Sequence, residues 1–535
     1  MGQHMNDYLS LSGAPTSPAH LLVRLPLFCK TVTEEYNHDF TLPDYLPEIR
    51  KMLRVTVTVL PPESYASASD VEYAGELRYH ILYTGADGEL HSTDLPAEYT
   101  LSVPVDPPAF CNLSMGVEAW ADGTPELLVT RVLSPRKLGI RTRIAFRTRA
   151  QAWHSLEESL TGNPNGRIER RVGEADSAVI LRGRTTAELV DEILPDAAFA
   201  ASPIRVAGHE EQVFVSEAIP DKDRVHLRGE LHLKLLLSHI QTESEEEGSA
   251  HPLTTVHRKI PFSVAVDLDG ADRYCDARGF GAPADIKLTV EDGRIIADAE
   301  FILTAECQKN QRFAYTRDLY STGAECETTV EVLPLPFALS AQNGNFTFSD
   351  TVSLENSGVS PSDRILDVCG DFGVEEVTEK NAQTVFTGTA HFHLLTENTD
   401  SGEFGFGEIS LPFRYLAPSA NDRTDLPAVK DHDASFVPLT IRTKRDGETL
   451  ALDAEVAVST RTAGATEIHR LTEAKFGEPE RKDSGAIVLT YPAPGTALWD
   501  VAKKYRTDLL PLAERNGLDP SPDAKITARF LVVKE

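Results

Sequence analysis

Three segments of the chain share one alternating pattern of apolar and polar residues. They read YAGELRYHILY at 73–83, LRGELHLKLLL at 227–237 and FTGTAHFHLLT at 386–396. Apolar side chains fall on every second position, which is typical of a strand with one buried face. A glycine stands at the same place in each copy, at Gly75, Gly229 and Gly388. This glycine predicts a bulge or the close approach of another backbone.

Further strand patterns follow each segment at matching places. The next ones are AEYTLSVPV (97–105), IPFSVAVDL (260–268) and LPFRYL (411–416), and the later ones are LGIRTRIAF (138–146), IIADAEFIL (295–303) and LALDAEVAV (450–458). The copies are roughly 155 residues apart, far longer than the repeats of solenoid proteins. We therefore predict three tandem β units over residues 5–165, 166–325 and 326–484, each with antiparallel sheets in a sandwich-like arrangement. The polar stretch Glu157–Asp176 is expected to link the first two.

The pattern changes near the end of the chain. Val488–Tyr491 and Phe530–Val533 are rich in β-branched and aromatic residues and predict two short strands. Between them, apolar residues recur at helical spacing in two runs. Thr496 and Asp508 are expected to cap the two helices, and Gly517 to end the second. The predicted fold class is thus mainly β, with three tandem antiparallel β-sandwich-like domains followed by a small βααβ module at 487–535.

Composition narrows the functional classes. Hydrophobic residues make up 41% of the 535 residues, enough for several folded cores. The formal net charge of −30 disfavours nonspecific nucleic-acid binding, because an acidic surface repels phosphate. Six cysteines without a CxxC pair suit a reducing cytosol better than a disulfide framework or a zinc ribbon. No apolar run approaches the roughly 20 residues that span a bilayer, so membrane insertion is not expected.

The start of the chain carries no secretory signal pattern. Met1–His4 is interpreted as a cloning scar ahead of a native start at Met5. We therefore expect the chain to meet its partner inside a cell.

No sequence pattern predicts catalysis. GxSxG, HExxH and P-loop motifs are missing, and no spacing singles out an acid/base pair among the many carboxylates. His391 and His393 form an HxH on one predicted strand. We interpret them as solvent-facing, since a zinc site would need further ligands. We predict that the chain is not an enzyme and has no cofactor and no metal site.

The C-terminal module resembles the LysM domain. Gly495, Leu498–Trp499, Ala502–Tyr505 and Asn516–Leu518 fall at the spacing of that family. The resemblance implies binding of glycans that contain N-acetylglucosamine, in a shallow groove between two loops. The usual Gly-Asp-Thr-Leu of the first loop is here Gly-Thr-Ala-Leu, and the usual Pro-Gly turn before the last strand is missing.

The resemblance also implies which residues form or support the binding surface. They are the two loops and part of the first helix, namely Gly495, Thr496, Ala497, Leu498, Trp499, Lys503, Tyr505, Leu518, Asp519 and Pro520. Trp499 is equally compatible with a position in the core of the module.

The body resembles the SPOCS-type domains of endospore-forming bacteria. Pro43-Asp44, Pro47 and Met52–Val55 lead into the first glycine strand as they do in that family. Asp318–Thr322 matches a second hallmark, Asp-x-Tyr-Ser-Thr, and the third copy keeps Pro361 and Ile365–Val368. Three such copies before one LysM-like module are similar to the clostridial family of spore-coat morphogenetic proteins.

This second resemblance implies a structural role. Proteins of that family act in the mother-cell cytoplasm at the forespore surface and help to attach the spore coat. The expected partner is the ATPase that polymerises as the coat basement layer, or another coat protein, and self-association of the β units stays open. The alternative is a LysM protein that binds peptidoglycan or N-acetylglucosamine oligomers, which an export signal and an intact Gly-Asp-Thr loop would favour.

Overall fold

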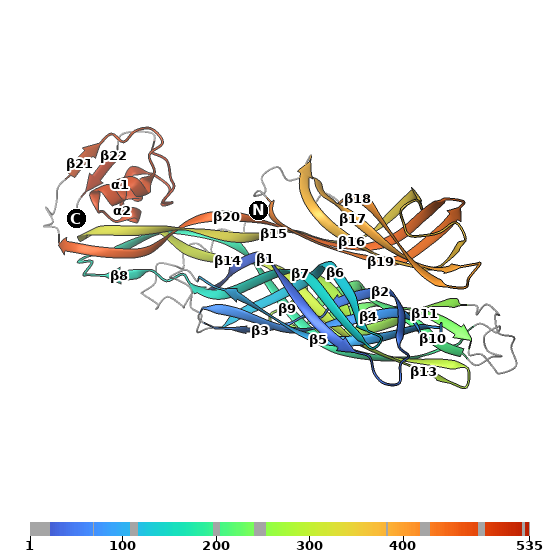
Figure 1. The fold of residues 1–535 in the computed structure, drawn as a ribbon. Coiled ribbons are helices and arrows are strands. Elements are labelled where there is room, and N and C mark those ends of the chain that lie inside the picture. The colour runs from blue at the N-terminus through green and yellow to red at the C-terminus, as the bar shows by residue number, and fades with distance from the viewer. Residues whose placement is uncertain are drawn as a thin grey trace.

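The described part of the chain consists almost entirely of strands (Figure 1). The computed structural model describes residues 22–67, 69–106, 116–195, 204–239, 253–380, 383–417, 429–479, 487–526 and 530–533. The predicted cloning scar at 1–4 lies outside the described residues. The prediction of the fold class is confirmed, because antiparallel sheets form the body and two short helices lie near the C-terminus.

Unit 1 (residues 22–155) is a sandwich of two antiparallel sheets. One sheet has the order β1 (Leu22–Thr41), β7 (Lys137–Ser155), β6 (Val117–Ser134). In the other, β4 (Asp70–Gly85) lies between β5 (Leu90–Pro104) and the pair β2 (Ile49–Val59) and β3 (Glu63–Ala66). Tyr73, Tyr79 and Phe146 fill the core between the sheets.

Units 2 (168–321) and 3 (324–479) repeat this topology. Unit 2 has the sheets β9 (Ile168–Ile193), β14 (Arg294–Ser321), β13 (Asp276–Glu291) and β10 (Ile204–Asp221), β11 (Arg224–His239), β12 (Thr254–Asp267). Unit 3 has the sheets β15 (Ala324–Ser353), β20 (Thr449–Pro479), β19 (Val429–Asp446) and β16 (Asp363–Lys380), β17 (Gln383–Asn398), β18 (Phe404–Leu416). In every unit the last strand is central in one sheet and a glycine strand is central in the other.

The segment predicted as a linker, Glu157–Asp176, contains strands instead. Ser159–Thr161 forms β8, which pairs in parallel with β20 of unit 3, and β9 already begins at Ile168. The first residues of β9 alternate between half-buried and exposed positions and many of them are charged, so their composition resembles that of a linker. Units 2 and 3 meet at the turn Thr322-Gly323, two residues before the predicted boundary.

Another backbone approaches Gly229 and Gly388 closely, as predicted, whereas at Gly75 the close group is the side chain of Tyr99. Each glycine pairs across the sheet with an aromatic residue, in the pairs Gly75–Tyr99, Gly229–Phe262 and Gly388–Phe413. Bulges in β10 and β16 lie opposite the second and third glycines. A Cβ at Gly388 would stand only 1.9 Å from the carbonyl oxygen of Gly373.

Gly388→Ala is therefore expected to destabilise unit 3 by about 1–3 kcal/mol, because the backbone of β16 must move aside. Gly373→Ala is the matched control, since its Cβ would lie 3.7 Å from the nearest atom, an ordinary contact. Urea unfolding of the two full-length variants checks this. Equal unfolding midpoints would show that the close approach at Gly388 does not constrain the residue.

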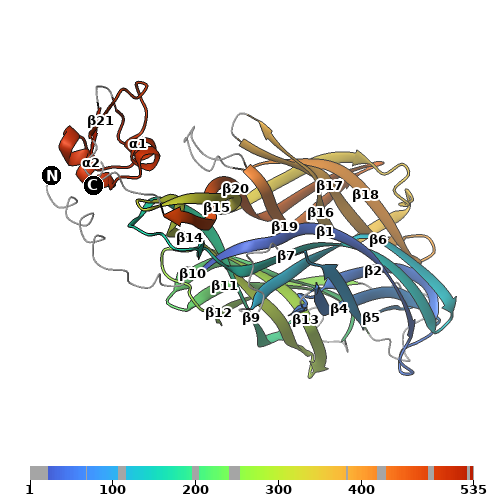
Figure 2. The same ribbon diagram turned by 90° about the vertical axis from the view of Figure 1, so that its left-hand side faces the viewer.

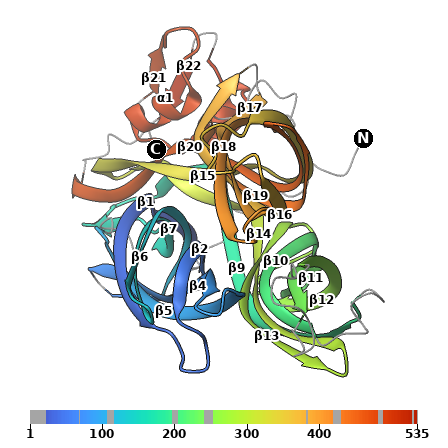
Figure 3. The same cartoon turned by 45° about the vertical axis from the view of Figure 1, so that its right-hand side comes forward.

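The three units pack around a common axis (Figure 3). The strands β2, β10 and β16 each carry a bulge at the same place, at Leu53, Ala207 and Leu366. These residues meet Leu82, Leu236 and Leu395, which stand at one position of the three glycine strands, in a single apolar cluster. Equivalent residues of all three copies thus contact one another, which indicates approximate threefold symmetry.

A charged layer lies at the same axis. Arg149, Glu306 and Arg461 each stand three residues after the repeated segment of the last strand of their unit, and all three are buried. Asp433 of β19 carries ion pairs to Arg149 of unit 1 and Arg278 of unit 2. The three units therefore meet in a buried network of charges as well as in an apolar cluster.

The C-terminal module (residues 487–533) consists of β21 (Ile487–Thr490), α1 (Leu498–Tyr505), α2 (Leu509–Asn516) and β22 (Phe530–Val533). It lies beside the ends of β15 and β20, at one end of the body (Figure 2). Gly517 ends α2 with a φ of 63°, as predicted. The predicted cap at Thr496 is wrong: Ala497 is the N-cap of α1, because the hydroxyl of Thr496 instead donates to the carbonyl of Ala493. Within the described residues, neither helix has the length and apolar character needed to cross a membrane.

Candidate functional site

The first predicted loop lies along a later segment of the C-terminal module. The backbone amides of Gly495, Leu498 and Trp499 donate to the carbonyls of Ile526, Ala524 and Pro522. The partner of this loop is therefore the segment 522–526, which follows the second predicted loop at 518–520. Both loops still reach the surface, where Gly495, Asp519 and Pro520 are exposed.

The other predicted site residues differ in their exposure. Thr496, Lys503, Tyr505 and Leu518 are half-buried, and Ala497, Leu498 and Trp499 are buried. Tyr505 acts inside the module, where its hydroxyl lies 3.1 Å from Oγ1 of Thr490 and ties α1 to β21.

Trp499 packs against the body of the protein. Only 1% of its surface is exposed, and its ring meets that of Tyr320 edge-on with the centroids 5.0 Å apart. Its indole Nε1 donates to Oδ2 of Asp318 over 2.8 Å. Trp499 therefore belongs to an apolar cluster that the C-terminal module shares with β14.

Charged and polar contacts reinforce this docking. Lys503 Nζ lies 2.6 and 2.8 Å from the two oxygens of Asp318. The hydroxyl of Tyr320 donates to the carbonyl of Thr507 over 2.7 Å, and burial raises the pKa of Tyr320. Arg506 of the module pairs with Glu325 of the body at 2.9 Å. Contacts from α1 and the residues that follow it therefore hold the C-terminal module against the body.

The body contributes this docking site through the motif Asp318–Thr322. Side chains alternate along a strand, so Asp318 and Tyr320 point toward the C-terminal module. Leu319 points the other way into an apolar cluster with Leu471 and Phe476 of β20. The hydroxyl of Ser321 donates to the carbonyl of Pro164, near β8. One short motif therefore joins the module, unit 3 and the start of unit 2.

A second surface of the C-terminal module faces solvent. Ile487, Leu489 and Tyr491 alternate along β21 and its end, and they are 70%, 54% and 65% exposed. The prediction from sequence missed these residues, because it placed the binding surface in the two loops and the first helix. The period of two in IVLTY was the available signal, since one face of such a strand must point outward.

Comparisons with known proteins do not assign this chain to a family. No family model matches it, no curated protein matches it, and no solved structure matches it. The function must therefore be argued from the geometry of the chain itself.

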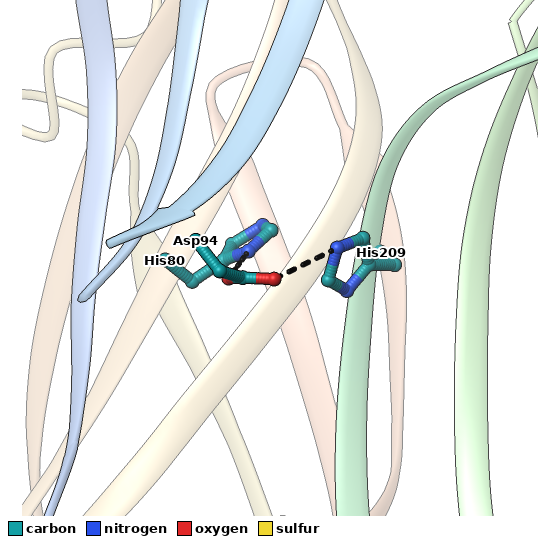
Figure 4. Close-up of side chains that lie close together, drawn as sticks. All are labelled: His80, Asp94 and His209. Atoms are coloured by element: carbon teal, nitrogen blue, oxygen red, sulfur yellow. Dashed lines mark hydrogen bonds and ion pairs between the residues drawn. The ribbon is translucent and has the colours of Figure 1, made fainter. Parts of the chain in front are cut away.

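A further group of functional side chains lies between unit 1 and unit 2 (Figure 4). Within the described residues, His80, Asp94 and His209 bring three ligand atoms within 4.8 Å of one another. Nδ1 of His80 lies 2.7 Å from Oδ1 of Asp94, and Nε2 of His209 lies 3.4 Å from Oδ2 of the same carboxylate. Glu211 accepts from Nδ1 of His209 at 2.9 Å.

Two carboxylates, Asp94 and Glu211, surround the imidazole of His209 with negative charge. Burial lowers the pKa of His209, but its hydrogen bonds to Asp94 and Glu211 outweigh burial and raise the pKa to about 10. Burial would raise the pKa of Asp94, whereas its bonds to the two imidazoles bring it well below the usual range. Burial lowers the pKa of His80 and outweighs its bond to Asp94. The sequence analysis did not find this group, because strands from two units bring it together.

Proposed function

We propose that this chain is a non-enzymatic scaffold for assembly of a spore coat or envelope, and that its C-terminal module docks to a coat morphogenetic partner. By resemblance, that partner is the ATPase of the coat basement layer or another coat protein. The place of action is then the mother-cell cytoplasm at the forespore surface. The observation that carries the proposal is the apolar face formed by Ile487, Leu489 and Tyr491 on β21.

This face supports a protein partner in particular. Large aliphatic side chains that are more than half exposed gain free energy when another protein covers them. A sugar would instead require polar groups and a flat aromatic surface. Trp499 does not offer such a surface, because it is buried against Tyr320.

The arrangement of the body supports the same role. Two joint clusters, one apolar and one charged, connect all three units at the axis. The C-terminal module is anchored to this body by Asp318 and Tyr320, with the face of β21 left exposed. A scaffold needs such a fixed spacing between the surface that binds a partner and the rest of the molecule.

Glycan binding is the second candidate, and a specific observation favours it. Gly495, Asp519 and Pro520 of the two predicted loops are exposed. A glycan that contains N-acetylglucosamine would then contact these loops without the help of Trp499. The loops and the face of β21 involve different residues, so the two candidates can be separated by mutation.

Binding of the full-length chain to the purified basement-layer ATPase tests the proposal. The double variant Leu489→Ser/Tyr491→Ser is expected to weaken binding at least about tenfold, since apolar anchor residues in an interface contribute about 2 kcal/mol or more each. The matched control Thr496→Ala/Asp519→Ala changes the loops and should bind as the wild type does.

Sedimentation with purified peptidoglycan runs beside this measurement. Saturable glycan binding that the loop variant loses, together with no binding of the ATPase, would overturn the scaffold proposal. Binding of the ATPase that is equal in both variants would overturn the assignment of the β21 face.

A further inference from the structure

The three glycine strands carry different ionisable side chains at one equivalent position. His80, Lys234 and His393 occupy the same place on the glycine strands β4, β11 and β17, two residues before Leu82, Leu236 and Leu395. Two of these side chains contact the first inner strand of the following unit. The ring of His80 lies beside that of His209 of unit 2, tilted by 60° with the centroids 4.5 Å apart, and Lys234 reaches Asp367 of unit 3.

The junction of unit 2 with unit 3 holds a buried ion network. Lys234 Nζ lies 2.7 Å from Glu210 and 3.0 Å from Asp367. The buried guanidinium of Arg54 lies beside the same two carboxylates and donates to Sγ of Cys369. Two carboxylates are thus matched there by two permanent cations, as burial of charge requires.

The junction of unit 1 with unit 2 also holds two carboxylates, Asp94 and Glu211, and within the described residues the groups bonded to them are the imidazoles of His80 and His209. Nε2 of His80 is buried and has no hydrogen-bond partner among the residues that the structure describes. The side chains of His80 and His209 are only 15% and 10% exposed. A cation with two positive charges at this place would match the two carboxylates and replace the protons that the two imidazoles share with Asp94.

We propose that His80, Asp94 and His209 bind a divalent transition-metal ion, with Zn²⁺ as the ion that fits their chemistry, and that the ion fastens unit 1 to unit 2. This inference is independent of the proposed scaffold function. Two imidazole nitrogens and one carboxylate oxygen are a frequent ligand set for zinc, and a water completes the tetrahedron. The site joins β4 and β5 of unit 1 to β10 of unit 2.

The distances agree with such a site. Zinc–ligand bonds of about 2.0–2.2 Å place tetrahedral ligand atoms about 3.3 Å apart. His209 Nε2 and Asp94 Oδ2 are 3.4 Å apart. The three ligand atoms lie within 4.8 Å of one another, so rotation of side chains closes the remaining gap. Nδ1 of His80 exchanges its contact with Oδ1 of Asp94 for the ion, which Oδ2 of Asp94 also binds.

Glu211 acts as a positioning residue. It accepts a hydrogen bond from Nδ1 of His209 over 2.9 Å and so holds the ring with Nε2 toward Asp94, where the ion takes the place of the Nε2 proton. A carboxylate behind a metal-binding histidine fixes the tautomer and raises the basicity of the ligand. This arrangement of a carboxylate behind a histidine is common at zinc sites.

The experiment uses the full-length chain without an added histidine tag. The chain is stripped with a chelator, dialysed and titrated with Zn²⁺ by calorimetry and in competition with a chromophoric chelator. One equivalent is expected to bind saturably and to raise the temperature of unfolding. His209→Gln is expected to abolish this binding, and Glu211→Gln to weaken it about 10–100-fold. His393→Gln, at the equivalent place in unit 3, is the matched control and should bind as the wild type does.

A wild-type chain that binds no zinc above the level of His209→Gln would overturn the proposal. The same holds if His393→Gln lowers the affinity as much as Glu211→Gln does. Cobalt gives a readout that does not depend on the stability of any variant. The wild type loaded with Co²⁺ is expected to give the intense visible bands of a near-tetrahedral site, and their absence would equally overturn the assignment.

Discussion

Trp499→Ala is expected to release the C-terminal module from the body and to unfold its helices, at a cost of about 3–5 kcal/mol. The side chain is 1% exposed and fills the cluster between α1, α2 and Tyr320. Its loss leaves a cavity in a module too small to compensate for it. The carboxylate of Asp318 also loses the indole donor.

Hydrogen exchange measured by mass spectrometry checks this in the full-length chain. Amides of α1 and α2 are expected to exchange about a hundredfold faster or more, since each 1.4 kcal/mol is roughly a factor of ten. Leu510→Ala on α2 is the matched control, because Leu510 is 50% exposed and its truncation should cost no more than about 0.5 kcal/mol.

A further variant distinguishes undocking from unfolding. Asp318→Ala removes the acceptor of Trp499 Nε1 and of Lys503 but leaves the core of the C-terminal module intact. Tyr320 and its neighbours should then exchange faster while α2 stays protected. If Trp499→Ala and Leu510→Ala exchange equally fast, the indole does not hold the module in place.

Much of the fold could be predicted from the alternation of apolar residues. The glycine strands, the later strands that repeat with them and the βααβ module follow from periods of two and of 3.6. The capping of α1 could not be predicted in the same way. Thr496 has the right side chain, but the backbone places it one residue before the cap at Ala497.

The packing of the units around the axis was not predicted, although a signal for it exists. The glycine strands end in consecutive buried residues, such as Ile81, Leu82 and Tyr83, where a strand with one buried face should alternate. Leu82 faces away from the core of unit 1 and into the cluster at the axis. A break in the alternation therefore marks the second buried face, but it cannot say which unit covers it.

The functional groups between units could not be found from spacing. His80 and His209 come from different units, and only the packing brings them within 4.8 Å. Trp499 was compatible with either a core or a binding position, because the sequence does not tell which surface Asp318 and Tyr320 present. The motif Asp318–Thr322 was noticed through resemblance alone, and its contacts give it a physical role.

Glu306→Gln is expected to destabilise the junction of the three units by about 3–5 kcal/mol, because it removes the charge of one partner from a buried ion network. Glu306 Oε1 lies 2.7 Å from Nη2 of Arg278 and 3.7 Å from Nε of Arg461. The side chains of all three residues are at most 4% exposed. The variant leaves Arg147, Arg278 and Arg461 with their ion pairs to Asp431 and Asp433.

Urea unfolding at neutral pH measures this loss, and Glu300→Gln on the same strand is the control. Glu300 is exposed on β14, six residues before Glu306, so its change should cost no more than about 0.5 kcal/mol. Equal midpoints for the two variants would show that the arginines at the axis do not depend on Glu306.

Acid titration gives a second check with a definite sign. Burial would raise the pKa of Glu306, but Arg278 and Arg461 outweigh it and lower the pKa. A carboxylate with a lowered pKa in the folded state stabilises fully above its unfolded pKa of about 4.3, and this contribution falls as the pH drops through the folded value. The wild type should therefore lose its advantage over Glu306→Gln as the solution is made more acidic than about pH 4. Protonated glutamate and glutamine both carry no charge and have similar shapes. If the difference in the free energy of unfolding between the wild type and Glu306→Gln stays constant down to pH 2, packing rather than charge holds the three units together at this position.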